Sequence, residues 1–140
     1  PDDDAAALPD GDQMQVDAAF SIPTNIYHFW LKKMSSYDLV QLIREHGSHE
    51  HQVNFYADQL CISPRYLNRI TAQHMAGKTP KQLIDEQLVA EAKVLLAEPS
   101  LTITEIAQRL NFVEQPHLTR FFKKATHISP SEYRRTLQQA

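Results

Sequence analysis

Two groups of polar residues, about fifty positions apart, have the types and the spacing that could bind the edges of DNA bases. Members of the first group stand at i, i+3 and i+4, and those of the second at i, i+4 and i+5, so a helix would carry each group on one side. The groups are Arg65, Asn68 and Arg69, and then Gln115, Thr119 and Arg120. Arginine can donate two hydrogen bonds to guanine, and asparagine or glutamine can pair with adenine. We therefore expect these six residues to contact bases.

Neighbouring residues extend the second group. Pro116 lies beside Gln115, and its methylene groups could touch the methyl group of thymine. Lys123 and Lys124, a turn further on, suit phosphates, which position a protein on DNA without specifying sequence. A run of charges is usually only a solvated face. Polar and basic residues that recur on the same face of two equivalent helices favour a binding surface instead.

The elements that must position these residues form a duplicated pattern of short helix, turn and longer helix. Equivalent residues recur at an offset of 50 or 51: Ala57 and Ala107, Leu60 and Leu110, Leu67 and Leu118, Arg69 and Arg120. Two copies are too few for a solenoid, so a duplicated supersecondary unit is the better description. Each copy has the spacing of a helix-turn-helix, with a small alanine where the two helices must approach closely.

The core of each copy is predicted from its apolar residues. We expect it to contain Tyr56, Leu60, Ile62, Leu67 and Ile70 in the first copy, and Ile106, Leu110, Phe112, Leu118 and Phe121 in the second. Asn111 is predicted to end its helix in a left-handed conformation, which asparagine tolerates next best after glycine. Pro116 is harmless at the start of the next helix, where its missing N–H has no partner to lose.

The complete chain is predicted to be all-α, with about seven helices. We expect helices over residues 37–46, capped by Ser36, and over 54–60, 64–74, 80–97, 104–110, 115–125 and 130–137. Residues 1–34 form an acidic tail with a possible short helix, 35–79 the first helix-turn-helix subdomain, 80–98 a linker helix and 99–140 the second subdomain. A linker helix of 18 residues would be about 27 Å long. It could hold two recognition helices roughly one DNA turn, about 34 Å, apart.

Composition limits the other classes of protein. The 140 residues suffice for one ordinary domain or two very small ones. The sequence contains no run of about 18 apolar residues, so no membrane span is predicted. The single cysteine, Cys61, excludes an internal disulfide framework and fits the cytoplasm. The net charge of −3 is unevenly distributed along the chain, because residues 1–30 hold six acidic residues and no lysine or arginine. The remaining 110 residues carry 14 basic and 11 acidic residues.

Five segments resemble the AraC/XylS family of bacterial transcription regulators in order and spacing. They are "FYADQLCISPRYLNRI", "PKQLIDEQLVAEAKVLL", "ITEIAQRLNF", "LTRFFKK" and "ISPSEYR". The resemblance covers residues 37–135 and implies two helix-turn-helix subdomains joined by a linker helix. It also implies base-reading positions at Arg65, Asn68, Arg69, Gln115, Pro116, Thr119 and Arg120. We further expect Ser63 and Thr102, together with Lys123 and Lys124, to contact phosphates.

The sequence departs from the family pattern at three positions. Asn111 and His127 stand where the family usually has glycine. Asparagine is a mild substitute, whereas a left-handed histidine is less favourable and is expected to shorten the preceding helix. Pro116 often corresponds to a polar residue, which weakens a hydrogen-bonding role there.

The resemblance implies partners as well as a fold. Double-stranded promoter DNA and RNA polymerase are the expected partners, with no membrane, no cofactor, no metal and no enzymatic activity. Such regulators generally carry an effector or dimerisation domain, for which the first 35 residues are too few. A small-molecule effector domain, if any, is therefore expected outside this chain.

Three other classes of function are alternatives to DNA binding. An enzyme would need Cys61 as its nucleophile, but this residue is predicted to be a small buried hydrophobe in a turn. A metal-responsive module could use His46, His49 and His51, although a solvated polar loop is the expected state of that segment. A helical protein-interaction module without a DNA target remains the main alternative.

Overall fold

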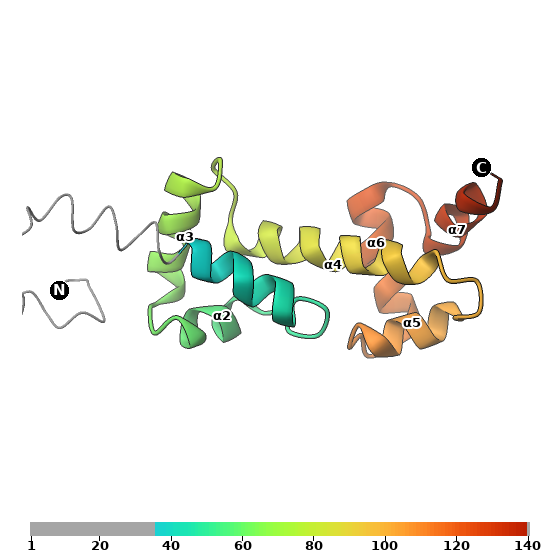
Figure 1. Ribbon diagram of the computed structural model, residues 1–140, viewed down its shortest axis with the longest axis horizontal. Helices are drawn as coiled ribbons and strands as arrows, with labels where there is room; N and C mark the ends of the chain where they lie inside the picture. The colour runs from blue at the N-terminus through green and yellow to red at the C-terminus, as the bar shows by residue number, and fades with distance from the viewer. Residues whose placement is uncertain (1–35, 140) are drawn as a thin grey trace, which may run out of the picture. The chain divides into compact units, whose positions relative to one another are not determined.

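The computed structural model describes residues 36–139, which are helical with turns and contain no strand (Figure 1). The helical segments are residues 36–46, α2 (Val53–Gln59), α3 (Pro64–His74), α4 (Pro80–Leu96), α5 (Ile103–Arg109), α6 (Gln115–Thr126) and α7 (Pro130–Gln139). The prediction of an all-α chain with about seven helices is confirmed over these residues. The predicted acidic tail, residues 1–34, lies outside them. Within residues 36–139, no helix is long and apolar enough to span a membrane.

The described residues divide into two compact units. Unit 1 contains residues 36–43 and 52–82, and unit 2 contains residues 44–51 and 83–139. Unit 1 therefore holds the α2–α3 pair, and unit 2 holds the α5–α6 pair together with α7 and most of α4. Each unit builds its own core around one short–turn–long helix pair.

The core of unit 1 forms where α2 and α3 meet. Tyr56 and Ala57 of α2 and Leu67 and Ile70 of α3 are fully buried. The predicted close approach at the small Ala57 is thus confirmed. Leu39, from the helix over residues 36–46, is equally buried. Ser36, which was predicted to cap that helix, is the first residue of its described part and is buried.

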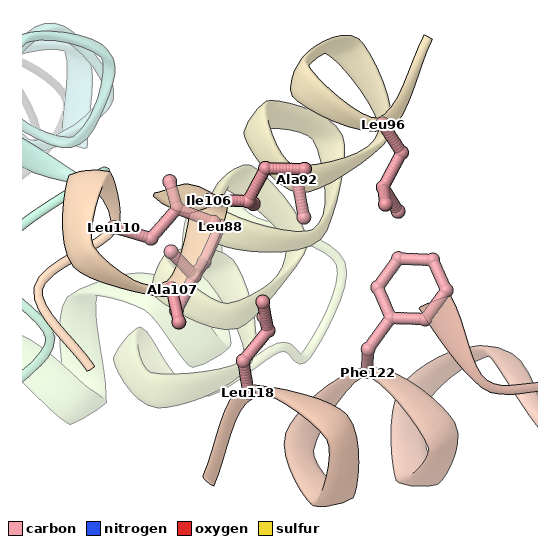
Figure 2. Packing of buried hydrophobic residues seen from close by; sticks show 8 residues of the cluster. All are labelled: Leu88, Ala92, Leu96, Ile106, Ala107, Leu110, Leu118 and Phe122. Atoms are coloured by element: carbon pink, nitrogen blue, oxygen red, sulfur yellow. The ribbon is translucent and has the colours of Figure 1, made fainter. Parts of the chain in front are cut away.

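The core of unit 2 is a cluster of eight buried residues from three helices (Figure 2). They are Leu88, Ala92 and Leu96 of α4, Ile106 and Ala107 of α5 with Leu110 directly after it, and Leu118 and Phe122 of α6. Phe122 was not predicted here. Phe121 was expected instead, but it is only half buried and packs against Phe112, with ring centroids 5.6 Å apart. Phe122 follows Leu118 by four residues, so the two side chains share the inward face of α6.

Reciprocal hydrogen bonds fix the start of three helices. At α5, Glu105 N–H donates to the Thr102 hydroxyl over 3.0 Å, and Thr102 N–H donates to the Glu105 carboxylate over 2.8 Å. Ser129 and Glu132 repeat this capping box at α7. Thr79 and Gln82 form the equivalent pair at α4. Because each box satisfies two N–H groups that the helix cannot satisfy itself, it sets the boundary of the helix.

The two capping boxes that contain glutamate make helix stability depend on pH. Hydrogen bonds from Thr102 lower the pKa of Glu105 below its ordinary value of 4.5, and Ser129 does the same for the pKa of Glu132. A carboxyl group whose pKa is lower in the folded state stabilises the fold at pH values above its unfolded-state pKa. This stabilisation is lost as the pH falls through the folded-state pKa. We therefore expect the melting temperature to fall between about pH 5 and about pH 3. A Glu105→Gln/Glu132→Gln double variant should show a shallower fall, measured by circular dichroism. Identical acid profiles would contradict this role.

The far end of α4 is held by a side chain of α7. Arg134 Nε donates to the Leu96 carbonyl over 3.1 Å, and its Nη2 donates to the Glu98 carbonyl over 3.2 Å. A helix leaves its last carbonyl groups without partners, so this guanidinium satisfies acceptors at the end of α4. Arg134 is consequently engaged within unit 2.

Within residues 36–139, four non-glycine residues take a left-handed backbone conformation. They are Cys61 (φ 58°), Ala76 (φ 56°), Asn111 (φ 61°) and His127 (φ 72°). The prediction for Asn111 is confirmed, and Cys61 occupies the equivalent turn position in unit 1. His127 does not shorten α6, which extends to Thr126, because its N–H still donates to the Lys123 carbonyl over 2.7 Å. Cys61 is exposed, so the prediction that it is buried was wrong.

Replacing Cys61 with glycine is expected to stabilise unit 1. A left-handed conformation costs a residue with a Cβ roughly 1–2 kcal/mol, a cost that glycine avoids. The exposed thiol contributes little packing in return. Cys61→Gly should therefore raise the free energy of unfolding by about 1 kcal/mol, measured by urea denaturation. A lower stability for Cys61→Gly would show that the thiol makes contacts that outweigh the backbone strain.

Candidate nucleic-acid interface

The first predicted group of base-reading residues lies on one exposed face of α3. Arg65, Asn68 and Arg69 are all exposed, whereas Leu67 and Ile70 on the opposite side are fully buried. The burial of that apolar side leaves the three polar side chains facing solvent together. The structure thus brings the group onto one surface, available to a partner of unit 1.

The start of α3 is defined by Ser63 and Pro64. The Ser63 hydroxyl accepts a hydrogen bond from Tyr66 N–H over 3.1 Å, and Pro64 occupies the first turn. A serine hydroxyl that accepts one hydrogen bond can still donate its own hydrogen. Ser63 therefore keeps a donor for a phosphate oxygen, at the helix end whose dipole favours anions. Tyr66 is half buried, and this burial raises the pKa of its phenol.

The second group lies on α6 and is less uniform. Gln115, Pro116 and Arg120 are exposed, while Thr119 is half buried. Leu118 and Phe122 lie on the inward face of α6, in the core, and Gln115 stands in the first turn on the same side of the helix as Leu118. Pro116 stands in the first turn, as predicted, where its missing N–H removes no helical hydrogen bond. Pro116, Thr119 and Arg120 are thus spaced on α6 as Arg65, Asn68 and Arg69 are on α3, whereas Gln115 stands at the start of the helix.

A residue of α5, absent from the sequence-based predictions, contacts this face. Thr104 Oγ1 donates to the Gln115 side-chain oxygen over 3.3 Å. The contact joins residues 11 positions apart, on two different helices. No periodic pattern in the sequence signals such a pair, because it depends on how α5 and α6 pack together.

The residues predicted to contact phosphates lie at helix ends. Lys123 and Lys124 are exposed in the last turn of α6. Thr102 is exposed at the start of α5, where its hydroxyl accepts from Glu105 N–H. Each of the three side chains can donate a hydrogen bond to a phosphate oxygen. The charge of Lys123 also lowers the pKa of Glu132, but less than the hydrogen bonds from Ser129 do.

The histidines considered as metal ligands have other contacts. Among residues 36–139, no group of three or more His, Cys, Asp or Glu side chains could hold a metal ion. The His49 carbonyl accepts from Asn111 Nδ2 over 2.9 Å, and the His51 ring lies 5.2 Å from that of Phe112, between centroids. His51 is half buried, so the prediction of a wholly solvated loop was wrong for that residue. Within unit 2, this segment packs against the turn between α5 and α6.

Two helix-turn-helix pairs with polar faces on their second helices define a DNA-binding class of fold. Residues 56–136 match the family described as a helix-turn-helix domain, which is more than half of the chain. With the relatives given below, this match shows that the chain belongs to the AraC-type family of helix-turn-helix transcription regulators. That family is one of DNA-binding regulators rather than enzymes.

Similar proteins include two regulators from Salmonella. The arabinose operon regulatory protein of Salmonella typhimurium (strain LT2) is 31% identical over 98 residues, which are 69% of this chain and 34% of that protein. The transcriptional activator RhaS of Salmonella schwarzengrund is 30% identical over 96 residues, which are 69% of this chain and 34% of that protein. This chain thus spans about a third of the length of these curated relatives.

Two solved structures share the fold. The C-terminal domain of AraT, a response regulator from Geobacillus stearothermophilus, has a TM-score of 0.67 and 32% identity, covering 73% of this chain and 84% of that one. The DNA-binding domain of AdpA, whose structure was determined with a target DNA, has a TM-score of 0.65 and 25% identity. The likeness covers 74% of this chain and 92% of that one. Each likeness covers about three-quarters of this chain.

Proposed function

We propose that this chain binds promoter DNA sequence-specifically, with α3 and α6 as recognition helices that enter two successive major grooves. The observation that carries the proposal is the repetition of one exposed polar face on the second helix of each unit. The AdpA domain, which has the same fold, was determined with a target DNA, and this supports the proposal.

Base contacts are assigned to the exposed faces of the two helices. Arg65 and Arg69 on α3 and Arg120 on α6 can each donate two hydrogen bonds to guanine. Asn68 and Gln115 supply amides that can pair with base edges, and Thr119 and Pro116 supply apolar contacts for thymine methyl groups. Ser63, Thr102, Lys123 and Lys124 are assigned to phosphates, which would orient both units on the duplex.

The remaining assignments rest on the family. RNA polymerase is proposed as a second partner, and the cytoplasm as the location. Because the matched part of the curated relatives is about a third of their length, a domain that binds a small-molecule effector would belong to another region of the complete regulator.

Selection of bound sequences from a random duplex pool tests the proposal directly. We expect a motif with two conserved halves, each read by one recognition helix. Affinity for the selected site should fall steeply with salt, because lysine and arginine displace counterions from phosphates. Failure to enrich any sequence, or a flat salt response, would instead favour a protein-interaction module.

A further inference from the structure

The side chain of Gln115 is oriented by a neighbouring helix. Thr104 Oγ1, on α5, donates to the Gln115 side-chain oxygen over 3.3 Å, within unit 2. Both residues are exposed. Gln115 is the first residue of α6, so its amide stands at the end of the recognition helix where base contacts concentrate. The hydrogen bond turns the amide oxygen toward α5.

The orientation of an amide determines which base it can pair with. A glutamine that pairs with adenine uses both ends, accepting from the adenine N6 amino group and donating to N7. With the oxygen bonded to Thr104, the NH2 group is the end left to pair with a base. Guanine offers two acceptors there, O6 and N7, and no donor. The donor end of Gln115 therefore fits guanine better than adenine.

We propose that Thr104 is a positioning residue that sets the base preference of Gln115, favouring guanine over adenine at the position this glutamine reads. The proposal deepens the proposed function and rests on it, since it requires Gln115 to contact a base. Thr104 acts through Gln115 and need not touch DNA. Its hydrogen bond gains strength when DNA excludes water from the surface, because competing hydrogen bonds to solvent are lost.

Thr104 can be changed without disturbing the helix that carries it. Its side chain is exposed, and the cap of α5 is formed by Thr102 and Glu105 instead. Thr104→Val keeps the shape of the side chain and removes only the hydroxyl group. Thr104→Ala removes the hydroxyl without the β-branch, whereas Thr104→Ser keeps the hydroxyl and serves as the matched control. All three variants should melt close to the unmodified chain.

The test compares base preferences within one selected duplex. Gln115→Ala first identifies the base position that depends on Gln115, by selection from a random pool. Affinities are then measured for duplexes with guanine or adenine at that position. The unmodified chain and Thr104→Ser should prefer guanine by about fivefold, the effect of one hydrogen bond. Thr104→Val and Thr104→Ala should lose this preference or reverse it toward adenine.

Different failures point to different errors. If the unmodified chain prefers adenine, or if Thr104→Val and Thr104→Ala keep its preference for guanine, the positioning role of Thr104 is wrong while DNA recognition stands. If Gln115→Ala changes no position of the motif, Gln115 reads no base and the positioning role is also overturned. If the unmodified chain selects no duplex at all, the proposed function itself fails.

Discussion

Phe122→Ala is expected to lower the free energy of unfolding of unit 2 by about 3–5 kcal/mol, the usual cost of deleting a buried phenylalanine ring. Phe122 is fully buried among the residues of α4, α5 and α6, and its ring centroid lies 5.6 Å from that of Tyr133. Removal of the ring loses its transfer free energy and leaves a cavity that these helices cannot fill completely. Stabilities of small domains are about 5–15 kcal/mol, so the variant should be partly unfolded near physiological temperature.

The adjacent Phe121 provides the matched control for this prediction. Its side chain has the same size but is only half buried, so Phe121→Ala should cost clearly less. Urea denaturation followed by circular dichroism measures both variants. Equal losses would contradict the assignment of Phe122 to the core and Phe121 to its edge. DNA affinity of Phe122→Ala should fall together with its helical signal, because only the folded fraction can bind.

Arg69→Ala and Arg120→Ala should each relax the base preference in one half of the selected site. Each arginine is exposed on its recognition helix, where a bidentate contact to guanine discriminates by about 1–3 kcal/mol. Neither variant should unfold, because both side chains lie outside the cores. Repeating the selection with each variant, alongside a melting curve, measures both effects.

Lys124 supplies the control for the arginine variants. Lys124→Ala should weaken binding to all sequences about equally and reduce the salt slope by about 1, as expected for a phosphate contact. An unchanged motif in both arginine variants would mean that the arginines touch only the DNA backbone. If both melt far below the unmodified chain with base preferences intact, the arginines are structural and the reading face has been assigned wrongly.

Helix boundaries were predictable because short-range chemistry determines them. Pro64, Pro80 and Pro130 each begin a helix, as their fixed φ and missing N–H favour. Asn111 takes the left-handed conformation predicted for it, since asparagine tolerates that region. The repeated alanine and leucine positions likewise predicted two helix pairs, because the spacing of apolar residues reports which side of a helix is buried.

The remaining features depend on tertiary packing. Of two consecutive phenylalanines, periodicity alone did not identify Phe122 as the buried one. Cysteine is typically a buried residue type, yet Cys61 is exposed in the left-handed turn that precedes α3. The Thr104–Gln115 hydrogen bond joins two helices, and the bond from Asn111 to the His49 carbonyl spans 62 positions. Such contacts have no local signal in the sequence.

Hydroxyl-radical footprinting on a selected duplex tests the central claim most directly, because it shows how many grooves the chain occupies. Two recognition helices in successive major grooves should protect two segments of the DNA backbone about 10 base pairs apart, on one face of the duplex. Arg120→Ala should weaken protection mainly in one segment and Arg69→Ala mainly in the other. Protection of a single groove, or of none on any selected sequence, would contradict the bipartite mode of binding.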